Sequence, residues 1–254
     1  MAENEVSNEP KFKFPTETIE LPSKGLIYPE DNPLSSGTIE MKYMTAKEED
    51  ILSNQSYIQN GTVLDKLLKS LIVSKIDYSD IIVGDKNAIM VAARVLGYGK
   101  DYEFEYKGEQ VSVDLSILEN KVFDEKAITR GVNEFSYTLP SSGTPITYKL
   151  LTHKDEMAIE AELRGLKKIN KNADPSVSTR MKYMILSVNG DDDRKTVREF
   201  VDNYLLARDA RAFRQHVREV QPDVDLNVMV EVNGGMEAID LPIGVTFFWP
   251  DATV

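Results

Sequence analysis

The spacing of apolar residues early in the chain predicts two helices in quick succession. From Thr62 to Val73, apolar side chains recur every three or four residues, with polar side chains opposite them. This is the pattern of an amphipathic helix that buries one face. A second helix is expected from Lys86 to Leu96, where Asp85 can cap its start and Gly97 lies beyond its end.

Alternation of apolar and polar residues predicts strands. Residues 101–106 and 110–115 alternate in this way around Lys107-Gly108-Glu109, as in a two-stranded hairpin. Further strands are expected at 17–21, 38–44, 133–139, 145–151, 227–233, 237–241 and 245–249, and further helices at 45–53, 152–169, 175–188, 197–205 and 208–220. Short antiparallel strands combined with amphipathic helices define an α+β fold.

The second half of the chain repeats blocks of the first half in the same order. Sixteen residues separate Asp85 from Asp101, and sixteen separate Asp209 from Asp225. Three more pairs of blocks match: Leu21–Gly25 with Leu139–Gly143, Ile39–Glu49 with Ile146–Glu156, and Leu71–Ser74 with Met184–Ser187. We therefore expect an internal duplication, with chance similarity among amphipathic helices as the alternative.

The repeat predicts two related α+β lobes. The chain of 254 residues is long enough for two modest lobes that share a core. The expected parts are a flexible N-terminal tail at 1–14, a first lobe at 15–120, a connector at 121–132 and a second lobe at 133–254. A helical turn is expected within the connector, at 124–128.

Composition narrows the classes of function. Hydrophobic residues make up 41% of the chain and charged residues 28%, as in ordinary globular proteins. No apolar run approaches the roughly 20 residues of a membrane span, and the acidic N-terminus does not resemble an export signal. With no cysteine, the chain has no disulfides or thiol chemistry, which fits a reducing cytoplasm. The net charge of −12 argues against nucleic acid and anionic membranes as partners.

Residues typical of catalysis are sparse. His153 and His216 fall in different predicted helices and have no cysteine beside them, so neither predicts a metal site or a general base. Asp191-Asp-Asp193 could hold a hard cation in a carboxylate-dependent metal enzyme, or it could be a solvated turn in which one aspartate caps the next helix. We predict a protein without catalysis, cofactor, metal or small-molecule substrate.

Three arginines form the first candidate site for a partner. Arg211, Arg214 and Arg218 are spaced three and four residues apart, so they share one face of their helix. This face could dock an acidic protein or bind RNA in a salt-dependent manner. The alternative is a solvated face whose charge is offset by Glu199, Asp202 and Glu219.

An aromatic run near the end of the chain forms the second candidate site. Phe247, Phe248 and Trp249 are consecutive, and Trp249 is the one tryptophan of the sequence. Leaving such a run in water is unfavourable. It either packs into the core or anchors another protein.

Several stretches resemble the baseplate hub subunits and hub assembly proteins of T4-like bacteriophages. They are Leu21–Pro29, Tyr43–Leu52 continuing into Gly61–Leu68, Gly84–Arg94 with Gly97–Gly99, and Phe247–Asp251. Some members of that family carry Cys-x-x-Cys pairs in their hairpin turns, where this chain has Lys107-Gly108-Glu109 and Asn233-Gly234-Gly235. No zinc is therefore expected here.

The resemblance implies a non-enzymatic viral tail protein. It would help to assemble the central hub of a contractile-tail baseplate in the host cytoplasm, through contacts with other hub or tail proteins. A permanent structural component of the baseplate in the virion is the alternative.

Overall fold

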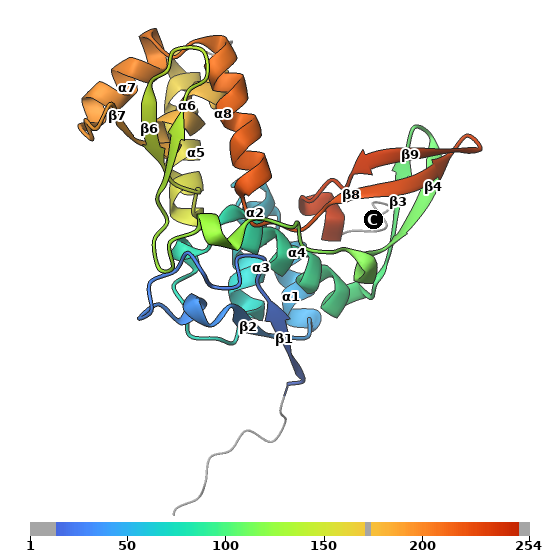
Figure 1. Ribbon diagram of the computed structural model, residues 1–254. Coiled ribbons are helices and arrows are strands. Elements are labelled where there is room, and N and C mark those ends of the chain that lie inside the picture. The colour runs from blue at the N-terminus through green and yellow to red at the C-terminus, as the bar shows by residue number, and fades with distance from the viewer. Residues whose placement is uncertain (1–13, 171–173, 249–254) are drawn as a thin grey trace, which may run out of the picture.

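The computed structural model describes residues 14–170 and 174–248, which adopt an α+β fold. Figure 1 shows two helical bodies, one from each half of the chain, and a pair of hairpins that projects to one side. The expected tail at 1–14 lies outside the described residues apart from Phe14.

The first half begins with a hairpin, continues with helices and ends with a second hairpin. Its elements are β1 (Thr16–Glu20), β2 (Thr38–Lys42), α1 (Ala46–Leu52), α2 (Gln55–Gln59), α3 (Val63–Leu71), α4 (Val83–Tyr98), β3 (Asp101–Tyr106) and β4 (Glu109–Asp114). Strands β1 and β2 pair antiparallel, as do β3 and β4. The two helices and the hairpin predicted from residue periodicity are confirmed, but the expected end of the second helix before Gly97 is wrong, because α4 continues through Gly97 to Tyr98 and is capped by Gly99.

The second half follows a similar order. Its elements are β5 (Phe135–Thr138), β6 (Pro145–Tyr148), α5 (His153–Ile169), α6 (Ser176–Met184), β7 (Ile185–Val188), α7 (Arg194–Asn203), α8 (Ala207–Val220), β8 (Asn227–Val232) and β9 (Gly235–Asp240). Strands β5, β6 and β7 form one antiparallel sheet, and β8 pairs with β9.

Two predicted elements of this half are wrong. The helix expected at 175–188 ends at Met184, because the chain then pairs with β6 as strand β7. The strand expected at 245–249 is a 3₁₀ turn over Val245–Phe248, and Trp249 lies outside the described residues. Apolar periodicity cannot distinguish these cases when the run is short and buried on both sides.

A buried carboxylate at the start of α4 holds the loop that follows β1. Asp85 accepts hydrogen bonds from the Ser23 backbone N–H (2.9 Å), the Ser23 hydroxyl (2.7 Å) and the Tyr28 hydroxyl (2.7 Å). The expected capping role of Asp85 is wrong, because Ile82 is the capping residue. Burial raises the pKa of Asp85 to about 6, although these hydrogen bonds act in the opposite direction.

The second half has the same arrangement at the start of α8. Asp209 is the third residue of its helix, as Asp85 is of α4, and it is fully buried. It accepts hydrogen bonds from the backbone N–H groups of Ser141 (2.7 Å) and Ser142 (3.0 Å) in the loop after β5. Burial alone would raise the pKa of Asp209, but these hydrogen bonds outweigh it and lower the pKa.

Other contacts also recur in both halves. Each second strand runs into a helix that starts with a capping box, Thr45 with Glu48 and Thr152 with Asp155. A lysine three residues before each box pairs with its acidic residue: Lys42 with Glu48 at 2.9 Å and Lys149 with Asp155 at 2.7 Å. Residues just after α3 and α6 pair with these strands, Ile72 with Met41 and Ile185 with Tyr148. Descent from a duplicated unit stays a prediction.

The expected spacing between the matched aspartates needs one correction. Strand β8 starts at Asn227, whereas Asp225 precedes it. Counted from the turns, Asn227 holds the place of Asp101, because Asn227 pairs with Asp240 as Asp101 pairs with Asp114. The second half thus has two more residues between the matched aspartate and the hairpin. The two turns agree, since both have consecutive positive φ angles, at 107–108 and 233–234.

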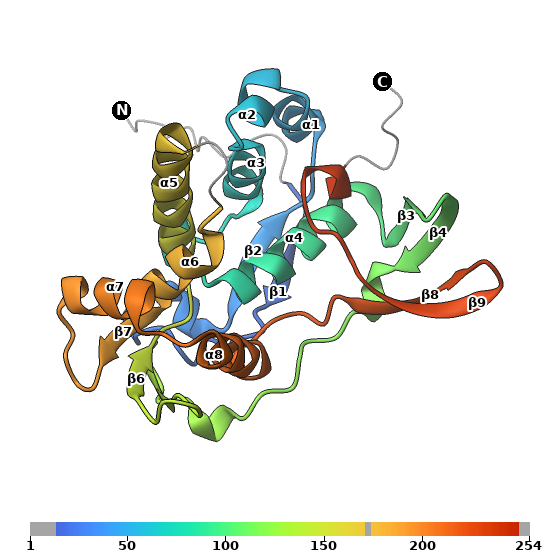
Figure 2. The same cartoon turned by 90° about the horizontal axis from the view of Figure 1, so that it is seen from above.

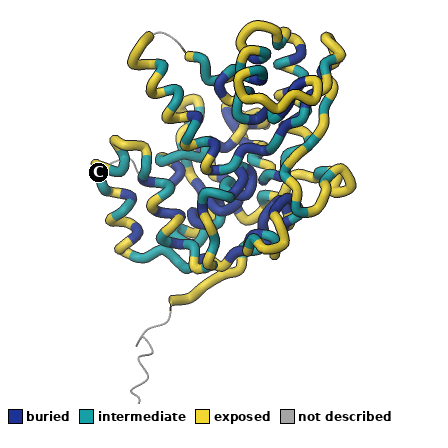
Figure 3. Tube along the Cα trace, turned by 90° about the vertical axis from the view of Figure 1, so that its left-hand side faces the viewer, coloured by how far each residue is buried: buried dark blue, intermediate teal, exposed yellow. Residues whose placement is uncertain are grey.

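The halves are joined by backbone and side-chain contacts around the start of α4. Ile82 and Thr152 form an antiparallel bridge, flanked by a hydrogen bond from Val83 N–H to the Leu151 carbonyl (3.1 Å). One apolar core runs through both halves, and Figure 3 shows buried residues in dark blue in the interior of the molecule. The helical bodies therefore pack as one unit.

The two hairpins pack together at one end of the molecule. Strand β8 lies beside β4, although the two belong to different halves, and Figures 1 and 2 both show the hairpins side by side. The connector runs along the segment that leads into β8, with a bridge between Asn120 and Val224. Its predicted helical turn is present at Glu125–Ala127.

The buried aspartates predict opposite pH dependences. Native Asp85, with its raised pKa, keeps a proton that the unfolded chain loses above about pH 4. The free energy of unfolding of the wild type, relative to Asp85→Asn, is therefore expected to fall as pH rises from about 4 to about 6, by up to about 3 kcal/mol. Urea denaturation at a series of pH values measures this difference.

Asp209→Asn serves as the matched comparison. The lowered pKa of native Asp209 means that its contribution is fully present above the unfolded pKa, near 4, and is lost as pH falls further. The wild type relative to Asp209→Asn should therefore gain stability as pH rises through this lower range. If the stability of the wild type relative to each variant changed with pH in the same direction for Asp85→Asn and Asp209→Asn, the opposite pKa shifts assigned to the two aspartates would be contradicted.

Candidate functional site

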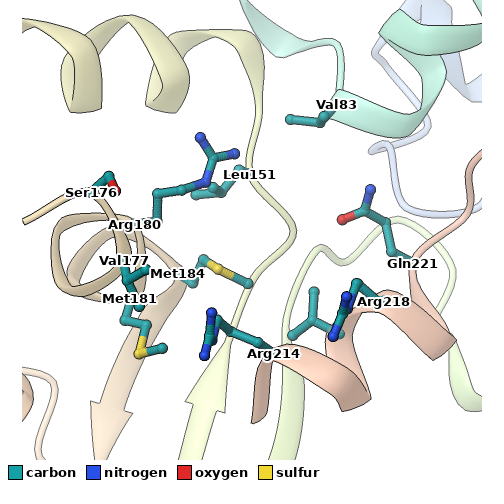
Figure 4. A pocket seen from close by; sticks show the side chains of 11 residues that line it. Val83, Leu151, Ser176, Val177, Arg180, Met181, Met184, Arg214, Arg218 and Gln221 are labelled. Carbon is teal, nitrogen blue, oxygen red and sulfur yellow. The ribbon is translucent and has the colours of Figure 1, made fainter. Parts of the chain in front are cut away.

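A cleft lies between α6 and α8, where the second half meets the start of α4. It encloses about 370 Å³. Figure 4 shows Arg180 and the methionines of α6 on one side, Arg214 and Arg218 of α8 on another, and Val83 of α4 across from them. Its lining consists of Val83, Leu151, Ser176, Val177, Arg180, Met181, Met184, Arg214, Val217, Arg218 and Gln221.

The floor of the cleft is apolar. Met181, Met184 and Val217 are largely buried, and so is Leu151. These side chains come from the inward faces of α6 and α8 and from the segment after β6. Methionine is unbranched and polarisable, so a methionine floor can adapt to differently shaped apolar groups.

Arginines form the rim of the cleft. Arg180 pairs with Glu156 of α5 at 2.9 Å, and the Arg214 side chain donates to the Ala210 carbonyl of its own helix. Within residues 14–170 and 174–248, Arg214 and Arg218 form no ion pair and the Arg218 side chain has no hydrogen-bond partner. Their positive charge therefore remains available at the mouth of the cleft.

Asp202 and Glu219 do not neutralise Arg214 or Arg218 by direct contact. Asp202 pairs with Lys182 at 2.6 Å, and Glu219 accepts a hydrogen bond from Gln215. Of the three predicted arginines, Arg214 and Arg218 line the cleft, whereas Arg211 does not. Sequence reasoning missed Arg180, because only the packing of α6 opposite α8 brings it to the same opening.

The aromatic residues of the second candidate site belong to the core as far as they are described. Phe247 and Phe248 are fully buried, and the Phe247 ring packs edge-on against Tyr102 with centroids 4.8 Å apart. Arg94 Nε donates to the Phe247 carbonyl (3.1 Å). The core alternative is therefore confirmed for Phe247 and Phe248, which are not available to a partner. Trp249 lies outside the described residues.

Both histidines have structural surroundings. His216 Nε2 lies 2.9 Å from the Tyr148 hydroxyl, and its ring stacks on Tyr137. His153 is buried where the halves meet, with its Nδ1 3.3 Å from Lys86 Nζ and its Nε2 3.5 Å from an Asp65 oxygen. Burial lowers the pKa of both histidines, and Lys86 adds to this effect at His153.

The acidic turn before α7 has a capping role. Asp193 is the capping residue of α7 and accepts a hydrogen bond from the Thr196 N–H at 3.2 Å. This outcome matches the capping alternative for Asp191–Asp193. Over the part of the chain that the structure describes, no three His, Asp or Glu side chains are grouped so that they could hold a metal ion.

Comparison with protein families, curated proteins and solved structures finds no match to this chain. Among the described residues, no helix combines the length and the apolar character needed to cross a bilayer.

The burial of Phe247 predicts a large loss of stability when its ring is removed. Phe247→Ala should reduce the free energy of unfolding by about 3–5 kcal/mol, because it removes a fully buried ring and leaves a cavity. Urea denaturation measures the change. Arg211→Ala, at an exposed position, should change stability by no more than about 0.5 kcal/mol. A Phe247→Ala variant as stable as the wild type would show that the ring is not part of the core.

Proposed function

We propose that this chain is a non-enzymatic tail protein of a contractile-tailed bacteriophage. It acts in the host cytoplasm, where it helps to assemble the central hub of the baseplate through contacts with other hub or tail proteins. The proposal needs neither a cofactor nor a small-molecule substrate.

The arginine-rimmed cleft is the observation that carries this proposal. The chain has a net charge of −12, so its average surface repels acidic proteins. Arg214 and Arg218, which form no ion pair among the described residues, place positive charge beside the apolar floor of the cleft, while Arg180 is paired with Glu156. Apolar floors with charged rims are typical of surfaces where proteins bind one another.

The resemblance to baseplate hub proteins supports the same proposal. Two of the resembling stretches, Leu21–Pro29 and Gly84–Arg94, meet in the structure where Asp85 holds Ser23 and Tyr28. These stretches therefore build the anchor of the first half. A protein that shares them would be expected to share this anchor and the fold around it.

Co-expression with the other hub proteins of the same phage tests the function. At least one hub protein is expected to co-purify with the tagged full-length chain, while an unrelated tail-fibre protein expressed in the same way should not. If no hub protein co-purifies, the proposed function is wrong. The protein composition of purified particles then separates an assembly factor, absent from virions, from a permanent baseplate component, present in them.

A further inference from the structure

The two halves differ at one corner of their common plan. Helix α6 takes the place of α3, because Ile185 and Ile72 follow them and pair with equivalent strands. Helix α8 takes the place of α4, because Asp209 and Asp85 hold equivalent loops. The cleft therefore lies between the two helices whose counterparts in the first half pack against each other.

In the first half this corner is closed by apolar side chains. Leu67 of α3 and Ala93 of α4 are fully buried, and Met90 nearly so. The Met44 side chain covers α4 so closely that a Cβ placed on Gly97 would lie 2.8 Å from its terminal methyl. Only glycine fits there without displacing Met44.

In the second half the same positions carry polar or shorter side chains. Arg180 corresponds to Leu67, because each lies five residues before its matched isoleucine, Ile185 or Ile72. Arg214 corresponds to Met90, because each lies five residues after its matched aspartate, Asp209 or Asp85. Gln221 replaces Gly97, and Leu151 replaces Met44. All four replacements line the cleft. The apolar packing that closes this corner in the first half is therefore absent from the second half, where two of the matched positions carry arginine.

Arg218 shows how the same residue type is used differently in the two halves. Its counterpart, Arg94, is buried and donates to the backbone carbonyls of Phe247, Gly99 and Asp101. Arg218 is exposed and has no such acceptors among the described residues. A guanidinium has five N–H donors and binds carboxylates in a bidentate manner.

We infer that the cleft binds a carboxylate-bearing segment of a partner protein. Apolar side chains of the segment lie on Met181, Met184 and Val217, and its Asp or Glu side chains pair with Arg214 and Arg218. A volume of about 370 Å³ is at the lower end of the range for a binding pocket, and it suits a few side chains of an amphipathic segment. The inference rests on the proposed function only in taking the occupant to be a protein.

Fluorescence anisotropy with defined peptides tests this inference on the full-length chain. The probes are a panel of labelled peptides that alternate Glu with Leu or Phe at helical and extended spacings, together with the same panel carrying Gln in place of Glu. We expect at least one Glu peptide to bind about tenfold more tightly than its Gln counterpart. The double variant Arg214→Glu/Arg218→Glu should weaken that binding by at least about tenfold.

Arg211→Glu is the matched control, because it changes charge on the same helix outside the cleft. At physiological salt, screening over about 8 Å should limit its effect to about threefold. Far-ultraviolet circular dichroism and urea denaturation should show that all variants are folded. The inference is overturned if no Glu peptide binds better than its Gln counterpart, or if Arg211→Glu weakens binding as much as the double variant.

Inorganic phosphate and ATP serve as competitors. Weak competition by ATP, at concentrations far above that of the peptide, is expected from charge alone. Binding of ATP that is tighter than that of every peptide would overturn the inference in favour of a phosphate-bearing ligand.

The inference about the cleft and the proposed hub function can be contradicted separately. Hub proteins that co-purify equally with the wild type and with the Arg214→Glu/Arg218→Glu variant would leave the hub function in place and overturn the role of the cleft. Peptide binding in the cleft without any co-purifying hub protein would do the reverse.

Discussion

The structure depends on two buried aspartates that tie a loop to the start of a helix. A carboxylate without partners is costly to bury, so it fixes whatever donates to it. Asp85 binds two donors of Ser23 and one of Tyr28, and Asp209 binds two backbone N–H groups. Each lies in the first turn of its helix, where the helix dipole also favours negative charge. The position of each long helix relative to its hairpin follows from these bonds.

The position of α4 in turn determines how the halves meet. Its first residues bridge to the segment after β6, and Val83 forms one wall of the cleft. The first half closes the corner beside α4 with Met44 over Gly97, whereas the second half leaves the corresponding corner open and lines it with Arg180 and Arg214. Closing it would bury guanidinium groups, which is unfavourable without acceptors. One structural plan thus yields a packed corner in one half and an arginine-lined cleft in the other.

Local patterns in the sequence predict much of this fold, because periodicity and capping residues act over a few neighbours. The hairpin around Lys107-Gly108 is an example. Asp85 was predictable as a residue at a helix start, but its true partner, Ser23, is 62 residues away. Only one side of the cleft was predictable, because its other side comes from residues distant in the sequence. The spacing of Arg214 and Arg218 marks one face of α8, while Arg180 joins them through tertiary packing alone.

Hydrogen–deuterium exchange on the complex with a co-purifying hub protein tests the central claim most directly, because it maps the contact surface without any substitution. If the cleft is the docking surface, binding should slow exchange in α6 and in the second half of α8, and leave the projecting hairpins β3–β4 and β8–β9 unchanged. Slower exchange confined to those hairpins, with α6 and α8 unchanged, would contradict the account.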